Sequence, residues 1–188
     1  LFPYTTLFRS VLSQIAAEAL TVPLEKIHII SSDTDVTPFD VGAYASSTTY
    51  LSGKAVQKCA EKVAGQILQV ASSILRSERE DLILAKGNVR DTKTGNSISF
   101  EDICLHALYT EDQFQIQAQA SHVSTESPPP FMAQFAEVEV DTATGQVRVS
   151  HFVSAVDCGQ PINPLLAEGQ VEGATINGIS YALCEDYL

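Results

Sequence analysis

The sequence predicts an α+β fold built from separate helices and mostly antiparallel hairpins. Two observations lead to this prediction. Apolar residues recur at helical spacing over residues 53–75, whereas residues 131–141 and 147–153 alternate between apolar and polar on either side of a turn-forming TATG. With 188 residues, 45% of them hydrophobic, the chain has enough apolar side chains for one large domain or two small ones.

Charge and cysteine content narrow the functional classes. The chain carries 11 basic and 23 acidic residues, a formal net charge of −12, and so acidic a surface repels phosphate backbones, so that no nucleic-acid partner is expected. No apolar run approaches the ~18 residues of a membrane span, so no membrane role is expected either. The four cysteines lie far apart in sequence and indicate neither a zinc site nor a disulfide framework, which favours a reducing, cytoplasmic location.

The N-terminal part is expected to contain a helix, a strand and a long loop. Residues 1–10 show no period that continues into the following segment, and they resemble the translated end of a common sequencing adapter, so we set them aside as an artefact. Apolar spacing predicts a helix over residues 11–20 that Pro23 ends. The β-branched run at residues 27–30 predicts a buried strand. Residues 33–52, rich in Asp, Thr, Ser and Gly, predict a long loop, and loops of that length are often functional.

Regular patterns return at residue 53. Residues 53–75 predict an amphipathic helix, and residues 82–89 predict a hairpin around a Lys-Gly-Asn turn. Ser99, followed three residues later by Asp102, predicts the capped start of a helix that ends near Tyr109.

The C-terminal part begins with a predicted linker. Residues 110–130 end in three prolines that favour an extended connector, and the hairpin described above follows. Asn163-Pro164 then predicts an N-cap with proline at the first helical position. We therefore expect an α/β segment over residues 11–109 with a small-residue loop, a linker over 110–130, and a hairpin-plus-helix segment over 131–188.

The titratable side chains form no recognisable catalytic set. Asp33 and Asp35 lack the fuller oxygen set of a calcium site and are expected to cap a turn. The four histidines are scattered and are expected at the surface or in strands: His28, His106, His122 and His151.

Two segments are candidate binding sites. The first is GAYASSTT at residues 42–49, where small side chains and hydroxyls leave backbone amides open before a helix, an arrangement that suits an anionic or heteroatom-rich ligand. The second is residues 163–173, where Gln170 can both donate to and accept from the edge of a heterocycle. Each has a plainer alternative, namely an ordinary Ser/Thr loop and tight helix packing around glycines. The helix contains three of them, each costing about 1 kcal/mol relative to Ala: Gly169, Gly173 and Gly178.

Several short motifs follow one another in a fixed order. They are SQIAAE at 13–18, DTDVTPFD at 33–40, GAYAS at 42–46, AEVEVD at 136–141 with TG at 144–145, DCG at 157–159, NP at 163–164 and EGQVEG at 168–173. In this order they resemble the molybdenum-binding subunit of bacterial xanthine dehydrogenases, in the xanthine dehydrogenase and aldehyde oxidase superfamily. The resemblance covers residues 11–188, weakly between 77 and 130. It implies an internal fragment of the second molybdopterin-binding domain of the large subunit.

The resemblance also implies the cofactor and its contacts. Molybdopterin would hold the molybdenum through its dithiolene sulfurs, so that no protein side chain need bind the metal. Ala45 would lie at the molybdenum centre through its backbone, and Ser46, Ser47 and Thr48 would bind the pterin and its phosphate-bearing tail. Gln170 would contact the cofactor from the late helix. The family commonly has Arg where this chain has Ser47, so that positive charge is missing here.

The activity implied is that of a molybdenum hydroxylase, which oxidises purines, other N-heterocycles or aldehydes with oxygen from water. Its electrons would pass to 2Fe-2S and FAD groups on partner subunits or domains. The base glutamate is expected beyond the C-terminal end, and a Gly-Gln-Gly cofactor contact is expected where the adapter-like residues stand, so the chain alone is expected to be inactive. Two alternatives stay open: another large chain of the superfamily, of the carbon monoxide dehydrogenase or hydroxybenzoyl-CoA reductase type, and a non-catalytic α/β interaction module.

Overall fold

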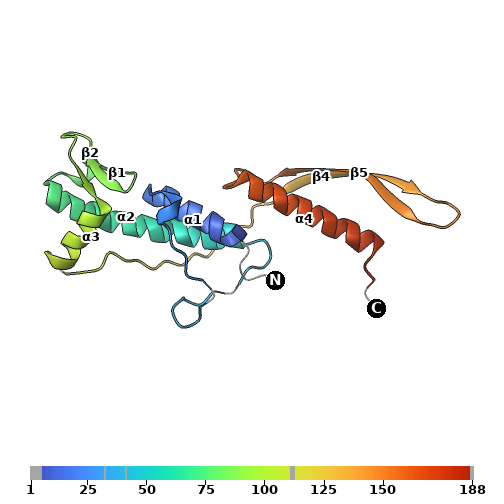
Figure 1. The fold of residues 1–188 in the computed structure, drawn as a ribbon, viewed down its shortest axis with the longest axis horizontal. Helices are drawn as coiled ribbons and strands as arrows, with labels where there is room; N and C mark the ends of the chain where they lie inside the picture. Colours follow the sequence, from blue (N-terminus) through green and yellow to red (C-terminus); the bar gives the residue numbers. More distant parts are fainter. Residues whose placement is uncertain (1–5, 32, 41, 111–112, 187–188) are drawn as a thin grey trace. The chain divides into compact units, whose positions relative to one another are not determined.

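The chain forms two compact units, residues 1–124 and residues 125–188. The structure is a computed structural model that describes residues 6–31, 33–40, 42–110 and 113–186. Each unit combines α-helix with antiparallel strands (Figure 1). This composition confirms the α+β class that the sequence predicts.

The first unit is arranged around its longest helix, α2 (Gly53–Leu75). A hairpin of β1 (Leu82–Ala85) and β2 (Asn88–Asp91) contacts this helix, and β3 (Ser97–Ser99) extends the hairpin to a sheet in the order β1-β2-β3. Helix α3 (Phe100–Tyr109) follows directly. The hairpin, α2 and α3 confirm the sequence predictions. Strand β3 was not predicted from the sequence, because three residues are too few for a periodic signal.

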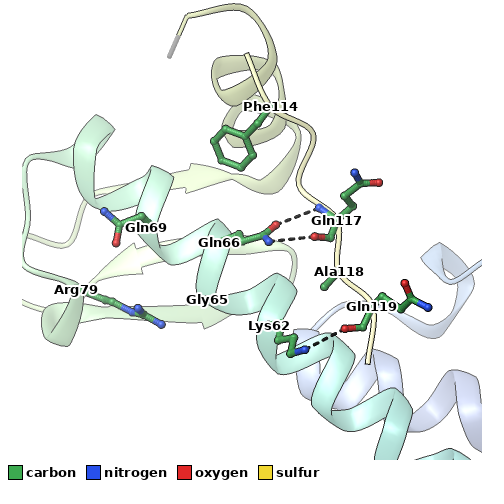
Figure 2. A pocket seen from close by; sticks show the side chains of 9 residues that line it. All are labelled: Lys62, Gly65, Gln66, Gln69, Arg79, Phe114, Gln117, Ala118 and Gln119. Atoms are coloured by element: carbon green, nitrogen blue, oxygen red, sulfur yellow. Dashed lines mark hydrogen bonds between the residues drawn. The ribbon is translucent and has the colours of Figure 1, made fainter. Parts of the chain in front are cut away.

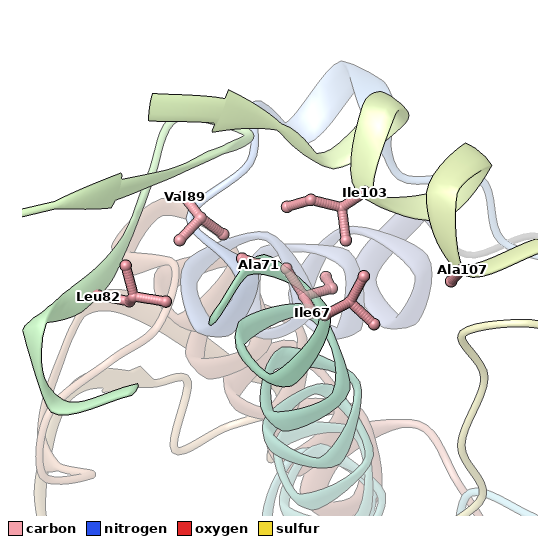
Figure 3. Close-up of a cluster of buried hydrophobic side chains, with 7 residues drawn as sticks. Ile67, Ala71, Leu82, Val89, Ile103 and Ala107 are labelled. Atoms are coloured by element: carbon pink, nitrogen blue, oxygen red, sulfur yellow. The ribbon is translucent and has the colours of Figure 1, made fainter. Parts of the chain in front are cut away.

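Seven buried apolar side chains form the core between α2, the sheet and α3 (Figure 3). They are Ile67, Val70 and Ala71 from α2, Leu82 and Val89 from the sheet, and Ile103 and Ala107 from α3. Val89 and Ile103 are 0% exposed. Full burial of a side chain of this size contributes roughly 1.5–3 kcal/mol, so this cluster is the main source of stability in the first unit.

One carboxylate is buried at the edge of this core. Asp91 is 1% exposed and accepts hydrogen bonds from the Ser77 hydroxyl at 2.5 Å, the Lys93 amide at 2.7 Å and the Thr94 amide at 3.0 Å. These donors stabilise the charged form, the Ser77 hydroxyl most of all, and hold the pKa of Asp91 well below its usual range. The carboxylate thereby ties the chain after α2 to the turn between β2 and β3.

Two predicted helix caps are present. The Ser99 hydroxyl oxygen accepts a hydrogen bond from the Asp102 amide at 3.1 Å at the start of α3. In the second unit, Asn163 Oδ1 accepts from the Leu166 amide at 3.1 Å, and Pro164 is the first residue of α4 (Pro164–Leu183). Both caps satisfy amides that have no partner inside the helix.

Two predictions for the N-terminal part are wrong. Helix α1 (Thr6–Leu20) begins at Thr6 rather than at residue 11, so it includes residues 6–10 that the sequence analysis sets aside, while residues 1–5 lie outside the described residues. Residues 27–30 form no strand, and Ile30 is 71% exposed. A β-branched run favours a strand only where a neighbouring backbone completes its hydrogen bonds, and none of the described strands pairs with this one.

The second unit is a ribbon followed by a helix. Strands β4 (Phe131–Val140) and β5 (Val147–Asp157) pair antiparallel, with a register shift between Glu137 and Val138, and α4 contacts β5. The hairpin and the helix confirm the sequence predictions. None of the described residues in this unit is buried. No helix in the described parts of the chain has the length and apolarity to cross a bilayer.

One face of the ribbon is an uncovered apolar surface. Phe131 and Phe135 lie on the same side of β4 because strand residues two apart share a face, and Val153 on β5 is paired with Phe135. Their exposed fractions are 66%, 69% and 54%. A single two-stranded ribbon is marginally stable in water, so this unit depends on further contacts.

The core predicts a sharp contrast between two neighbouring positions on α3. Ile103→Ala should lower the free energy of unfolding by about 2–5 kcal/mol, because it leaves a cavity that water does not fill. Leu105→Ala removes equally many carbon atoms from a side chain that is 51% exposed, and should cost about 1 kcal/mol or less. Urea titrations of the full chain followed by circular dichroism measure both. Equal losses would contradict the packing of α3.

Asp91 predicts a pH dependence. A carboxylate whose pKa is lower in the folded than in the unfolded chain contributes stability above its unfolded pKa of ~4 and loses that contribution as the pH falls. The urea midpoint of the wild-type chain should therefore fall between about pH 5 and pH 2. Asp91→Asn should start from a lower midpoint at neutral pH and fall less steeply. Glu61→Gln, at an exposed carboxylate of α2, is the matched control and should follow the wild-type curve.

Candidate functional site

The small-residue segment forms a tight turn immediately before α2. Ala45 and Ser46 both adopt left-handed backbone conformations, with φ of 48° and 57°. Ser47 returns to the right-handed helical region, and a π-helical turn η2 (Thr48–Ser52) then runs directly into α2. The loop predicted over residues 33–52 therefore ends at Ser47, because the helical axis begins one turn earlier than the apolar spacing indicates.

The backbone of this turn is strained. A left-handed conformation costs a residue with a side chain about 1–2 kcal/mol, and Ala45 and Ser46 adopt it in succession. The Ser47 amide and hydroxyl both donate to the Tyr44 carbonyl, at 3.0 and 2.7 Å, and so close the turn. Both strained backbone and π-helical turns are concentrated at functional sites. The geometry therefore supports a functional role for the segment that the sequence singled out.

The turn presents donors to solvent. Among the residues that the structure describes, none accepts a hydrogen bond from the amide of Ala45 or Ser46. Both side chains are small and exposed, so atoms of a ligand have room to approach the backbone. The amides at the start of η2 lie at the positive end of a helical dipole. Ala45, Ser46, Ser47 and Thr48 together fit a ligand that is rich in acceptors and carries a phosphate.

Gln170 lies in the other unit, on the first half of α4, with its side chain exposed. A Cβ atom added at Gly169, Gly173 or Gly178 would meet nothing within 4 Å. The tight packing considered as the plainer explanation for these glycines is therefore absent among the described residues. Ala45 lies in the first unit and Gln170 in the second. A shared site formed by the two residues stays a prediction.

Sequence reasoning missed a polar surface that leads towards the Ala45 turn. Residues 113–124 run extended along α2, in the opposite direction to the helix, and we call them the strap. The Gln66 side chain donates to the Gln117 carbonyl and accepts from the Gln117 amide, both at 3.0 Å, and Lys62 Nζ donates to the Gln119 carbonyl at 3.0 Å (Figure 2). These residues belong to the stretch in which the sequence predicts a linker.

The spacing of these contacts follows from two repeat lengths. Four residues of an α-helix advance by about 6 Å, and two residues of an extended chain advance by about 6.6 Å. Side chains four apart on α2, such as Lys62 and Gln66, therefore reach backbone groups two apart on the strap, such as those of Gln119 and Gln117. Two sequence signals could have indicated the strap: this row of long polar side chains on α2, which periodicity alone assigns to solvent, and the alternation of apolar residues with glutamines over residues 114–120.

A shallow hollow of about 580 Å³ lies beside the strap (Figure 2). Its lining consists of Lys62, Gly65, Gln66, Gln69, Arg79, Phe114, Gln117, Ala118 and Gln119. The Arg79 side chain lies over Gly65, where an added Cβ would come within 3.3 Å of Arg79 Nη2. Lys62 and Gln66 already bind the strap backbone, so the hollow is part of strap docking rather than of the Ala45 turn.

The titratable residues have local roles. Asp33 caps a turn, as predicted: its Oδ1 accepts from the Asp35 amide at 3.0 Å. His122 lies in the strap, with Nδ1 at 3.0 Å from Lys58 Nζ. Within the described ranges, no three His, Cys, Asp or Glu side chains are grouped so that they could hold a metal ion.

Comparison with known proteins gives a consistent set of relatives. The model of a family described as "Molybdopterin cofactor-binding domain" matches residues 8–188. "Probable hypoxanthine oxidase XdhD" of Escherichia coli (strain K12) is 39% identical over 180 residues, which cover 95% of this chain and 19% of that protein. "Xanthine dehydrogenase molybdenum-binding subunit" of Escherichia coli O157:H7 is 35% identical over 183 residues, which cover 95% of this chain and 24% of that protein.

A solved structure extends the comparison to the fold. The crystal structure of quinoline 2-oxidoreductase from Pseudomonas putida 86 is similar, with a TM-score of 0.74 and 26% sequence identity. The match covers 88% of this chain and 22% of the quinoline 2-oxidoreductase chain. The present chain spans 19% and 24% of the length of the two curated relatives.

The strained turn predicts opposite effects for the same substitution at two nearby alanines. Ala45→Gly should leave the free energy of unfolding unchanged or raise it by up to about 1 kcal/mol, because glycine adopts a left-handed conformation without strain. Ala43→Gly, at a residue without a positive φ, should lower it by about 0.4–1 kcal/mol, because glycine only adds freedom to the unfolded chain. Urea titration decides the signs, and a loss at Ala45 as large as at Ala43 would contradict the strain.

Proposed function

The chain belongs to the molybdopterin cofactor-binding domain family, and we propose that it forms part of a molybdenum hydroxylase and helps to bind the molybdopterin. The observation that carries this proposal is the turn at Ala45 and Ser46. It combines two strained residues with amides that are open to a ligand, and it contains the residues that the family resemblance predicts as cofactor contacts.

The proposed contact residues offer the cofactor three kinds of group: backbone amides, hydroxyls and a side-chain amide. The amides of Ala45 and Ser46 donate to acceptor atoms of the cofactor, and the hydroxyls of Ser46 and Thr48 add further donors. The Ser47 hydroxyl already donates to the Tyr44 carbonyl at 2.7 Å, so it offers the ligand an acceptor. With serine at this position, amides rather than a guanidinium group meet the phosphate charge. Gln170 adds an amide edge from α4.

When bound, molybdopterin supplies a metal centre that takes electrons from the substrate while oxygen from water is inserted. The chain's own residues orient that group. The names of the relatives mention hypoxanthine, xanthine and quinoline, which favours purines and other N-heterocycles as substrates, with aldehydes as a further class. We place the catalytic base and most of the substrate pocket in other segments of the parent protein, since the chain spans at most 24% of the two relatives' length.

The parent protein is proposed to act in the cytoplasm as one subunit of a complex with iron–sulfur and FAD components. One relative is named as a molybdenum-binding subunit, which supports partner chains. The second unit gives further support. None of its described residues is buried, and Phe131, Phe135 and Val153 form an uncovered apolar face. Large exposed apolar patches mark contact surfaces, so other parts of the parent protein or its partners are proposed to cover this one.

Cofactor content of the purified parent protein tests the proposal. Molybdenum is measured by mass spectrometry, and the pterin is measured by the fluorescence of its oxidised form. Gln170→Ala should weaken cofactor binding by roughly tenfold, the equivalent of about one lost hydrogen bond to the ligand. Gln146→Ala, in the turn between β4 and β5, is the matched control and should retain full occupancy. A clean parent protein without molybdenum and pterin would refute the function, and equal occupancy in both variants would remove Gln170 from the site.

Substrate assays on the same protein separate the activities within the superfamily. Oxidation of hypoxanthine, quinoline or an aldehyde is the expected result. Turnover of carbon monoxide alone would replace this assignment with a carbon monoxide dehydrogenase activity. The 188-residue chain by itself should show no turnover, because a general base contributes about 10²–10⁴-fold and is proposed to lie in the rest of the parent protein.

A further inference from the structure

The strap ends beside the turn to which the proposed function assigns the cofactor. Ser124 Oγ lies 3.2 Å from the Tyr50 hydroxyl, and Tyr50 belongs to η2, which follows Ser47 directly. Two residues earlier in the strap, His122 Nδ1 lies 3.0 Å from Lys58 Nζ. These two contacts fasten the C-terminal end of the strap to η2 and the first turns of α2.

The two ends of the strap are held differently. Phe114 and Ile116, near its beginning, pack against the apolar core. In its middle, the Cys59 thiol donates to the Ala118 carbonyl at 3.1 Å, next to the Gln66 and Lys62 contacts. Beyond the Gln119 carbonyl, the side-chain contacts of His122 and Ser124 hold the strap to η2 and α2, so its C-terminal end depends on polar groups.

The contact between Lys58 and His122 requires a neutral imidazole. A lysine ammonium has three donors and no acceptor, so Nδ1 must accept and therefore carries no proton. Protonation of Nδ1 would place two cations about one hydrogen-bond length apart. The charged groups that act on the ring are the ammonium groups of Lys58 and Lys54, both on α2. Partial burial of the ring, followed by these two charges, lowers the pKa of His122.

We propose that the strap positions the candidate cofactor turn, and that the contact between Lys58 and His122 is a latch that opens when His122 is protonated. Opening separates Ser124 from Tyr50 and removes a contact that restrains η2, so residues 45–48 loosen at acid pH. The link to a cofactor rests on the proposed function, whereas the latch is a property of the chain's own residues.

Proton linkage gives the direction of the effect. With the strap open, His122 titrates near the ordinary value of ~6.5, whereas with the strap closed it titrates lower. About one pH unit or more above ~6.5 both forms are neutral and the latch has its full strength. As the pH falls, the open form binds the proton first. The balance then shifts towards the open strap, at most about tenfold for each unit by which closure lowers the pKa of His122.

Hydrogen exchange of the full chain without cofactor tests the latch. Backbone exchange is followed by mass spectrometry in peptides that cover the strap and residues 44–52, at about pH 7.5 and pH 5, with rates corrected for intrinsic chemistry. We expect protection of the strap, whose Gln117 amide donates to Gln66 Oε1, to fall at the lower pH by a factor on the order of ten per unit of pKa difference. Residues 44–52 should lose protection at the same time.

Three variants make the test specific. His122→Asn keeps an acceptor near the Nδ1 position but does not titrate, so its corrected protection should be equal at both pH values. Lys58→Met removes the donor and its charge, so the strap should be poorly protected at both pH values. His151→Asn, on β5 of the second unit, should retain the wild-type response.

Equal protection of the wild-type strap at both pH values, or a pH response retained in His122→Asn, would overturn the latch. A response of the strap without one in residues 44–52 would overturn its positioning role. Both readouts are independent of cofactor content, so a parent protein without molybdopterin would refute the proposed function and leave the latch standing. Conversely, a loaded parent protein whose strap ignores pH would refute only the latch.

Discussion

Helix α2 packs against three neighbours, namely the apolar core, the strap and helix α1. Which residues of α2 face each neighbour determines how the first unit is arranged. Ile67 enters the apolar core, while Gln66, the residue before it, binds the strap backbone. Successive residues of a helix point about 100° apart, so adjacent positions serve different partners. Near its start, Gly53 lets the Ile15 side chain of α1 approach, to 2.8 Å from where a Cβ would stand. A change of register in this one helix would disturb all three contacts.

The candidate site takes its shape from the same helix. The turn at Ala45 and Ser46 leads into η2, and η2 continues as α2 without a break. Such a turn persists only if its surroundings impose it, because two left-handed residues with side chains are unfavourable in a free loop. The Ser47 bonds close it on one side and the helical turn restrains it on the other. The strap adds a restraint from residues distant in sequence, through Tyr50. The backbone at this end of α2 is thus in contact with the strap through Tyr50.

The second unit differs from the first in having no buried residue among those described. Its ribbon and helix nevertheless form from local signals. A Cβ added at the glycines of α4 would meet none of the described residues within 4 Å. Gly169, Gly173 and Gly178 lower the intrinsic stability of this helix. Glycine at such positions also allows a ligand or another backbone to approach closely. The exposed side chains of Phe131 and Phe135 are a second sign that this unit has no core of its own among the described residues. This unit exposes its apolar side chains, whereas the first unit has a core of its own.

The sequence by itself determined the elements whose signals are local. The spacing of α2, the caps at Ser99 and Asn163, and the turns of both hairpins are written in neighbouring residues, and motif order pointed to Ala45, Ser46, Ser47, Thr48 and Gln170. Tertiary structure decided the rest. Residues 27–30 have a strand composition but no partner, and the strain at Ala45 follows from hydrogen bonds that close around it. The strap is the clearest case. The alternation of Phe114, Ile116 and Ala118 with glutamines marks an extended segment with one covered face. It does not mark the polar contacts, because side chains of α2 bind backbone carbonyls of the strap and every residue carries the same carbonyl.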